Sequence, residues 1–261
     1  MEHSGVFSPD QKQFLFTTSD PEYQQFTVQV VEWSDMGWSK PRKAHFSAQY
    51  SDHGTSFSRD GKRVFFASLR PAEGAADTSD WHLWTATRGS RGWGEANLVN
   101  LPGWGAHWQS HPVQAADGSL YFHQFSARND RDFDLLRAVW EGDRYGKPAP
   151  LGPAINTPGV EISPYLSPDQ SYLLFAAYDR PDGFGGGDLY LSRRGQDGEW
   201  SPAENLGPSI NTAYEESNPT ITPDGQFLIF SSSRPQGGET TGEGSLLHLY
   251  WVSTEALSRR G

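Results

Sequence analysis

The sequence predicts an all-β protein with a β-propeller fold. Residues 151–180 recur closely as residues 206–234, and each copy holds two short apolar runs joined by a Ser-Pro-Asp-Gln or Thr-Pro-Asp-Gly turn. Such a turn between apolar runs is typical of a β-hairpin. Patterns with a helical period are nearly absent, and 28 Gly and 18 Pro punctuate the 261 residues. One hairpin unit cannot bury its apolar face alone, so its repetition predicts an array of packed sheets.

Five copies of the hairpin follow one another along the chain. An aspartate marks the turn of each copy, and successive aspartates are 50, 57, 52 and 55 residues apart. They are Asp10, Asp60, Asp117, Asp169 and Asp224. This period predicts a single propeller domain over residues 1–261, most simply with five blades of four-stranded antiparallel sheets. The expected blades span about 1–50, 51–107, 108–159, 160–214 and 215–261.

Each blade is expected to begin with the apolar run before the turn and to continue with the run after it, which ends in Phe. A third apolar run and an aromatic turn then lead to an outer strand. The aromatic turns hold Trp38, Trp93, Tyr145 and Trp200, which we expect to pack between blades. The expected strands of the first four blades are 5–8, 13–18, 27–33 and 42–46; 55–58, 63–68, 81–87 and 96–99; 112–114, 120–125 and 134–140; and 164–167, 172–177 and 188–193.

The fifth blade is expected to be incomplete. It supplies strands at 219–222, 227–232 and 247–253, and no aromatic turn or fourth strand follows before Gly261. Either an N-terminal strand of the native protein is absent from this chain, or the blade closes imperfectly. An unpaired strand edge invites pairing with another chain, so a protein partner at this edge is one prediction.

Composition narrows the class of partner. The net charge of −11 and the pI near 5.1 argue against nucleic acid or an anionic membrane as the main partner, because both favour a clustered basic face. No cysteine is present, so no disulfide framework is expected. No apolar run reaches the length of a transmembrane helix, and no signal sequence precedes the first repeat. The protein is then either cytoplasmic or exported with a signal that this chain lacks.

Four motifs in the last two blades carry a resemblance. They are Leu206-Gly207 with Ile210-Asn211-Thr212, Glu216 with Pro219 and Thr222-Pro223-Asp224-Gly225, Gly186-Gly187-Asp188-Leu189-Tyr190, and Gly198-Glu199-Trp200-Ser201-Pro202. With these motifs the sequence resembles the WD-like propeller repeats of the TolB type. The resemblance covers nearly the whole chain and is weaker in the third blade, where Ala115-Ala116 replaces Ser-Pro. It implies a propeller, usually in exported or periplasmic bacterial proteins, and does not fix one activity.

Polar residues that precede the inner strands are expected to meet at one mouth of the central channel. Counting back from the turn aspartates gives Glu2-His3, Asp52-His53, Gln109-Ser110 with His111, Glu161-Ile162 and Glu216-Ser217. Loops after the second strands should open on the same face, and four of them begin with an arginine: Arg70, Arg128, Arg180 and Arg234. Because these acids and arginines recur, the favoured interpretation is an ion-pair clamp between adjacent blades.

A functional interpretation of the same face stays open beside the clamp. The four arginines could bind a ligand together with Trp104, His107 and Trp108, which lie in an insertion outside the period. His3, His53 and His111 with a carboxylate could hold a divalent transition metal. The turn aspartates, in contrast, are expected to hydrogen-bond their own turns.

Three classes of function follow. The leading hypothesis is a binding module of the bacterial envelope, periplasmic or secreted, whose polar central pocket holds a carbohydrate-like or other small polar ligand, or a peptide. The enzyme alternative is a metal-dependent lyase or hydrolase acting on a sugar acid, with Glu161 or Glu216 as general base and Arg180 on the substrate carboxylate. The third is an interaction scaffold that recruits another protein through the unpaired edge.

Overall fold

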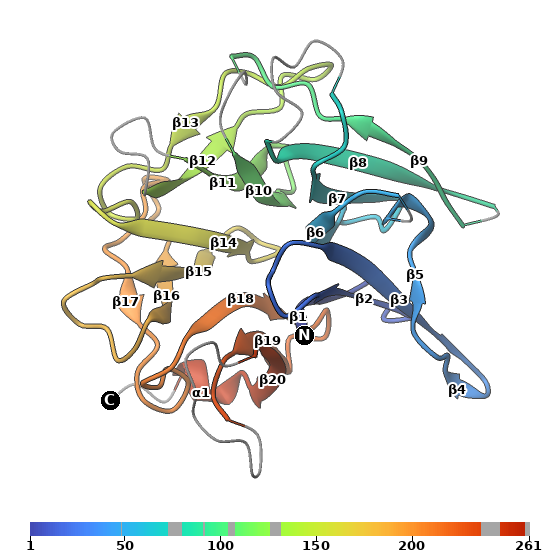
Figure 1. The fold of residues 1–261 in the computed structure, drawn as a ribbon. Helices are drawn as coiled ribbons and strands as arrows, with labels where there is room; N and C mark the ends of the chain where they lie inside the picture. The colour runs from blue at the N-terminus through green and yellow to red at the C-terminus, as the bar shows by residue number, and fades with distance from the viewer. Residues whose placement is uncertain are drawn as a thin grey trace.

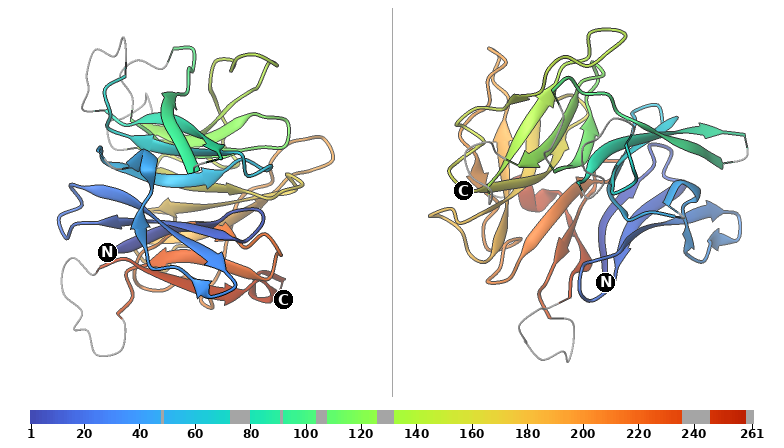
Figure 2. Two further views of the ribbon diagram at one scale, coloured as in Figure 1. Left: turned by 90° about the vertical axis from the view of Figure 1, so that its right-hand side faces the viewer. Right: turned by 45° about the horizontal axis from the view of Figure 1, so that its top comes forward.

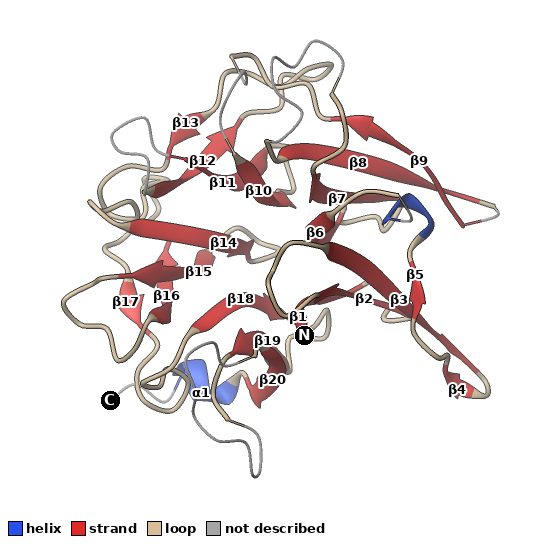
Figure 3. Cartoon of the chain, viewed as in Figure 1, coloured by secondary structure: helices blue, strands red, loops and turns tan. Residues whose placement is uncertain are grey.

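The computed structural model is built almost wholly from β-strands, with two short helices, η1 and α1 (Figure 3). It describes residues 1–47, 49–72, 80–90, 92–103, 108–125, 132–235 and 246–258. Trp104, His107 and Arg128, three of the predicted ligand-binding residues, lie outside this range. Among the described residues, no helix is both long enough and apolar enough to span a bilayer.

The strands occur in five antiparallel units, called units 1 to 5 in sequence order. Unit 1 contains β1 (Glu2–Phe7), β2 (Gln13–Ser19), β3 (Phe26–Ser34), β4 (Gly37–Trp38) and β5 (Arg42–Lys43), followed by η1 (His45–Ser47); unit 2 contains β6 (Asp52–Phe57), β7 (Arg63–Ser68), β8 (His82–Gly89) and β9 (Gly92–Leu98); unit 3 contains β10 (Gln109–Gln114), β11 (Leu120–Phe125), β12 (Phe133–Ala138) and β13 (Ala149–Pro150); unit 4 contains β14 (Val160–Leu166), β15 (Tyr172–Tyr178), β16 (Gly187–Arg193) and β17 (Glu204–Asn205); unit 5 contains β18 (Glu216–Ile221), β19 (Phe227–Ser232) and β20 (His248–Ser253), followed by α1 (Glu255–Ser258).

The units are arranged around a common centre (Figure 1, Figure 2). The first strand of each unit is innermost, and each inner strand contacts the inner strand of the next unit, including β18 with β1. One parallel bridge, Phe133 to Val160, links units 3 and 4 into a continuous sheet. The predicted propeller of antiparallel sheets is therefore confirmed, while the predicted blade limits stay a prediction from the repeat period.

The inner hairpins of units 1, 2, 4 and 5 are closed by the same hydrogen bonds, whereas unit 3 has Ala115 in place of the hydroxyl residue and Asp117 accepts from the Ser119 N–H (2.9 Å). In unit 1 the Ser8 hydroxyl donates to Asp10 (2.6 Å), and Asp10 accepts from the backbone N–H of Lys12 (3.1 Å). Asp60, Asp169 and Asp224 are held in the same way by the serine or threonine two positions earlier. Hydrogen bonds from the hydroxyls of Ser171 and Ser167 lower the pKa of Asp169 to about 2. The turn aspartates thus hydrogen-bond their own turns, as predicted.

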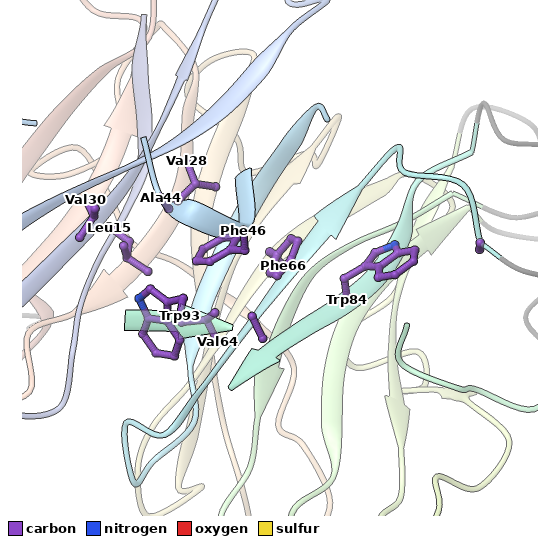
Figure 4. Packing of buried hydrophobic residues seen from close by; sticks show 11 residues of the cluster. Leu15, Val28, Val30, Ala44, Phe46, Val64, Phe66, Trp84 and Trp93 are labelled. Atoms are coloured by element: carbon purple, nitrogen blue, oxygen red, sulfur yellow. The ribbon is translucent and has the colours of Figure 1, made fainter. Parts of the chain in front are cut away.

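Four clusters of buried apolar side chains fill the junctions between successive units. In the first cluster, Leu15 and Val28 of unit 1 face Val64, Phe66 and Trp93 of unit 2 (Figure 4). Tyr145 and Trp200 pack into the second and third clusters. The predicted packing of the aromatic turns between units is confirmed for these three residues. Trp38 is different: it is 44% exposed and contacts Phe7 and Trp33.

Unit 5 meets unit 1 without a comparable cluster among the described residues. The Glu2 N–H donates to the Leu247 carbonyl (3.3 Å), and the Ser4 N–H donates to the Ser231 hydroxyl (3.2 Å). In the described part of unit 5, β20 is followed by α1 and no fourth strand is present. The incomplete fifth sheet therefore agrees with the sequence prediction.

The junction clusters predict a contrast in stability between two aromatic residues. Phe66 is fully buried and stacks on Phe46, with ring centroids 4.6 Å apart. We expect Phe66→Ala to lower the free energy of unfolding by about 3–5 kcal/mol, and Trp38→Ala to lower it by no more than about 1 kcal/mol. Urea denaturation of the two variants measures the difference. Equal losses would show that Trp38 is as deeply packed in solution as Phe66.

Candidate functional site

All five inner strands break their register at the same point. A β-bulge follows His3, His53, Ser110, Ile162 and Ser217 in the pairing with the second strand of each unit. The next residue takes a left-handed backbone conformation with φ between 49° and 62° in every unit. These residues are Ser4, Gly54, His111, Ser163 and Asn218, together called the bulge ring. A left-handed residue other than glycine is strained by about 1–3 kcal/mol, and bulges commonly redirect side chains near functional sites.

Hydrogen bonds connect members of the bulge ring from different units. The Ser163 hydroxyl donates to the side-chain oxygen of Asn218 (2.9 Å), and the Asn218 amide donates to the Ser231 hydroxyl (3.2 Å). The Ser4 hydroxyl lies 3.4 Å from Nε2 of His111. The Ser110 hydroxyl contacts Nδ1 of the same imidazole (3.0 Å). Units 1, 3, 4 and 5 are thereby linked by uncharged polar groups near the axis.

Gly54 leaves room for the His111 ring. A Cβ atom added at Gly54 would lie 2.9 Å from Cγ of His111, closer than real carbon contacts allow. The φ of Gly54, +62°, also favours glycine over an L side chain. The imidazole of unit 3 thus occupies the space that a bulge-ring side chain of unit 2 would fill.

A cavity of about 360 Å³ lies between the bulge ring and the inner hairpin turns. All five inner strands line it, so it is the described part of the central channel. Its polar wall includes Thr55, Ser56, Gln114 and Thr220 in addition to the ring. The Ser56 hydroxyl donates to the Pro112 carbonyl (2.5 Å), whereas the buried Oγ1 of Thr55 has no hydrogen-bond partner among the described residues.

Arg59 is the one charged side chain among the described residues that line this cavity. It lies in the inner hairpin turn of unit 2, where the other units have Pro9, Ala116, Pro168 and Pro223. Its guanidinium donates to the Pro168 carbonyl of unit 4. An exposed arginine therefore reaches from one side of the cavity mouth to the other.

Three buried histidines, His3, His53 and His123, gather with the half-buried His111 at and beyond the bulge ring, away from the turns. The ring centroids of His53 and His111 are 5.0 Å apart, and those of His111 and His123 are 5.1 Å apart. Ser110 contacts His53 (3.1 Å), and the Ser163 N–H donates to Nδ1 of His123 (3.1 Å). Burial is the main cause of their low pKa values: about 3 for His3, about 4 for His111, and well below the ordinary value for His53 and His123.

The predicted metal ligands His3, His53 and His111 are thus brought close together. Their ring nitrogens contact serine hydroxyls, as in the 3.1 Å contact between His3 Nδ1 and Ser4. In the described residues, no group of three or more His, Asp and Glu side chains is arranged to hold a metal ion. The geometry is that of a hydrogen-bonded cluster of neutral imidazoles.

The predicted acids and arginines form buried ion pairs. Arg70 pairs with Asp52 (2.8 Å), Arg180 with Glu161 (3.0 Å) and Arg234 with Glu216 (3.1 Å), and all three acids are fully buried. Each guanidinium also donates to a backbone carbonyl in the connection from the preceding unit: Phe46, Ile155 or Ile210. The prediction that these pairs bridge adjacent blades is wrong, because both partners belong to one unit. The arginine instead fixes the incoming connection to that unit.

These contacts favour a structural role for Glu161, Glu216 and the three described arginines over catalysis or ligand binding. Glu161 accepts hydrogen bonds from the Thr157 N–H (3.0 Å) and hydroxyl (2.6 Å) as well as from Arg180. Burial raises the pKa of Glu161 despite these bonds. The guanidinium of Arg180 lies over the rings of Phe175 and Tyr190, 5.2 and 4.6 Å from their centroids. None of these residues lines the cavity.

Trp108, the one described member of the predicted aromatic ligand platform, is half-buried and packs against other aromatic rings. Its ring centroid is 6.2 Å from that of Trp81 and 5.8 Å from that of Phe133. His111 is therefore the only predicted site residue among the described residues that line the cavity. The sequence reasoning missed the bulge ring, although His111-Pro112, Ser163-Pro164 and Asn218-Pro219 carried a signal, because proline within a strand marks a bulge or an edge.

Comparison with known proteins gives the fold. No protein-family model matches the chain, and no curated protein matches its sequence. An α-L-arabinofuranosidase from Lactobacillus brevis aligns with a TM-score of 0.60 and 12% identity, over 97% of this chain and 90% of the other. BT0996, in a structure of an RGII complex, aligns with a TM-score of 0.62 and 8% identity, over 97% of this protein and 87% of the other. At such identities the likeness shows a common propeller fold.

Part of a larger structure is also similar. Hydrazine synthase from Kuenenia stuttgartiensis aligns with a TM-score of 0.57 and 11% identity, over 98% of this chain and 38% of the other. The same fold therefore occurs both as most of a protein and as a portion of one.

The buried ion pairs predict a large loss of stability from a single substitution. Arg180→Met removes the partner of a fully buried carboxylate, and we expect it to lower the free energy of unfolding by about 3–5 kcal/mol. Arg42→Met breaks an exposed pair with Glu32 and should lower it by less than about 1 kcal/mol. Chemical denaturation of both variants at neutral pH tests this. Near-wild-type stability of Arg180→Met would contradict a structural role and reopen a ligand-binding one.

The buried histidines predict a loss of stability in weak acid. Their folded pKa values lie below the unfolded value of about 6.5, so the unfolded chain binds more protons once the pH falls below 6.5. Their stabilising effect is complete above pH 6.5 and declines as the pH falls toward about 4. His111→Asn should reduce the slope of stability against pH by up to about 1.4 kcal/mol per pH unit. An unchanged slope between pH 6 and 4.5 would mean that His111 is not held neutral.

Proposed function

We propose that the chain is a binding module that holds a small uncharged polar ligand of the carbohydrate class in the central cavity. The observation that carries the proposal is the bulge ring. Three of the five inner strands direct a small polar side chain, and a fourth directs an imidazole, toward a cavity of about 360 Å³, a volume within the range of small-ligand sites. A sugar presents several hydroxyl groups, each of which both donates and accepts hydrogen bonds, and it therefore suits a wall of hydroxyl, amide and neutral imidazole groups.

The protonation state of the wall supports an uncharged ligand. His111 has a pKa of about 4 and is therefore neutral at pH 7, with one nitrogen as donor and the other as acceptor. Thr55 offers a buried hydroxyl with no partner among the described residues, and such a group gains from a ligand hydrogen bond. The apolar part of the lining, which includes Val6, Val113 and Ile221, suits the C–H faces of a sugar ring.

The fold relatives and the resemblance are consistent with this proposal. One structure of the same fold is an α-L-arabinofuranosidase, a carbohydrate-active enzyme. Its 12% sequence identity to this chain supports a shared fold only. The resemblance to TolB-type repeats favours an exported, periplasmic or secreted protein over a cytoplasmic one. The metal-dependent enzyme hypothesis has no specific observation in its favour, since Glu161 and Glu216 are buried in ion pairs outside the cavity.

A titration with uncharged sugars tests the proposal. Isothermal titration calorimetry and ligand-observed NMR with a panel of neutral mono- and disaccharides should identify at least one ligand. Thr55→Val removes the free hydroxyl at nearly constant volume and should weaken binding about fivefold. Thr85→Val is the matched control, because Thr85 bonds the Val64 carbonyl outside the cavity. If no sugar binds, or if both variants weaken binding equally, the central cavity is not a sugar site.

A further inference from the structure

The third strands of units 1 to 4 are covered on their outer edge in one recurring way. In each of these strands, the carbonyl of one buried residue accepts a hydrogen bond from the N–H of the residue that directly follows the outermost strand of the unit. The four pairs are Val28 with Ala44 (2.8 Å), Leu83 with Val99 (2.9 Å), Leu135 with Leu151 (3.0 Å) and Leu189 with Leu206 (2.9 Å). All four acceptor residues are fully buried. The edge of each sheet is thus capped by an extended segment of the chain.

The N–H of the same edge residue is satisfied by a side chain in three of these units. The Val28 N–H donates to the Ser47 hydroxyl (3.0 Å). The N–H groups of Leu135 and Leu189 donate to the side-chain amide oxygens of Asn156 (2.9 Å) and Asn211 (2.8 Å), respectively. In units 3 and 4 the capping segment reads Leu-Gly-Pro-x-Ile-Asn, at 151–156 and 206–211. Its isoleucine is buried in the cluster between that unit and the next. A leucine, an isoleucine and an asparagine therefore define the cap.

Leu249 of β20 occupies the equivalent position in unit 5. It pairs with Ser231 of β19, as Leu189 pairs with Ala176 of β15. Within the described residues no segment pairs with the other edge of β20, and Leu249 is only half-buried. Two residues further on, Trp251 is 69% exposed, although its counterparts Val30 and Leu191 are buried. This edge of β20 from Leu249 to Trp251 is called the open edge.

The surface beside the open edge is aromatic and continues the junction between units 5 and 1. Phe7 and Phe14 of unit 1 are half-buried with ring centroids 4.6 Å apart, and Trp38 adjoins Phe7 at 5.9 Å. Their counterparts at the junction of units 3 and 4, Leu166 and Leu173, are buried in the cluster that also receives the Ile155 cap. The junction between units 5 and 1 thus presents apolar side chains from both units, but among the described residues no capping isoleucine packs between them.

Unit 1 also lacks the clamp that fixes an incoming connection in other units. Asp20 stands where Arg70 and Arg234 stand relative to their turns, and Glu2 is exposed where Asp52 and Glu216 are buried. A segment added at the open edge would therefore be held by backbone hydrogen bonds and aromatic contacts without a buried ion pair. Such a segment can bind and dissociate.

We propose that the open edge binds an extended segment of a partner protein that carries an apolar residue and, five positions later, an asparagine, in the manner of Leu-Gly-Pro-x-Ile-Asn. The segment runs antiparallel to β20, with two residues opposite Trp251 and Tyr250, as β17 lies opposite Leu191 and Tyr190. The next residue donates its N–H to the Leu249 carbonyl, and the asparagine accepts the Leu249 N–H. This is strand addition with a side-chain cap. This binding is proposed whether or not a ligand occupies the central cavity.

The protein itself supplies a probe for this surface. A synthetic peptide with the sequence of residues 203–212, Ala-Glu-Asn-Leu-Gly-Pro-Ser-Ile-Asn-Thr, is labelled at its N-terminus and titrated with the whole protein, with fluorescence anisotropy as the readout. We expect saturable binding that Trp251→Ala weakens by about tenfold or more, because exposed tryptophans dominate such interfaces. Phe184→Ala, an exposed aromatic between β15 and β16 of unit 4, should leave it unchanged. A peptide with aspartate in place of its leucine should not bind.

Hydrogen exchange at single residues gives a second, direct readout. In the free protein the Leu249 amide should exchange much faster than the amides of Leu135 and Leu189, and saturating peptide should slow it. The proposal is overturned if the peptide does not bind, if Trp251→Ala and Phe184→Ala have equal effects, or if the Leu249 amide is already protected in the free protein. It is also overturned if sedimentation shows a dimer that Trp251→Ala dissociates and the peptide does not, since a second copy then covers the edge.

Discussion

The constraint on which the rest of the structure depends is the convergence of five inner strands on one axis. A regular strand would send its side chains alternately to the two faces of its own sheet and would leave little to fill the centre. The bulge in each inner strand adds one residue in a left-handed conformation and turns that residue toward the axis. Small polar residues suit this position in three units. The hydrogen bonds between them then fix the units relative to one another.

Residues that recur from unit to unit serve the architecture, and residues that depart from the repeat give the centre its chemistry. The acid and arginine of units 2, 4 and 5 hold the incoming connection, and the turn aspartates hold the hairpins. In contrast, His111, Gly54 and Arg59 each stand where the other units have something else. The imidazole of His111 fits because Gly54 has no side chain, so two departures in neighbouring units depend on each other.

The repeat, the turn chemistry and the three-stranded form of the described part of unit 5 were readable in the sequence because each depends on local pattern. The site was predicted at the other side of the bulge ring, since residues such as Glu161 and His53 were placed by counting along an unbroken strand. The bulge shifts the register by one residue, and the acids there turn inward to their arginines. Whether these acids form structural ion pairs or a binding site depends on how deeply they are buried. A single sequence does not show that burial. The three X-Pro pairs of the inner strands were the available clue to the bulge.

Ser231 connects the open edge to the central cavity. Its hydroxyl accepts the Ser4 N–H and the Asn218 amide, so it joins the bulge ring at the point where units 5 and 1 meet. On the next strand its partner is Leu249, the centre of the open edge. Among the described residues, units 5 and 1 lack the apolar cluster found at the other junctions, so these polar contacts contribute to positioning β18 and β19 against β1. A segment that covers Leu249 would restrain β19 and with it Ser231. Because a ligand stabilises the arrangement that it binds, we expect occupancy of the open edge to increase order in the bulge ring through Ser231.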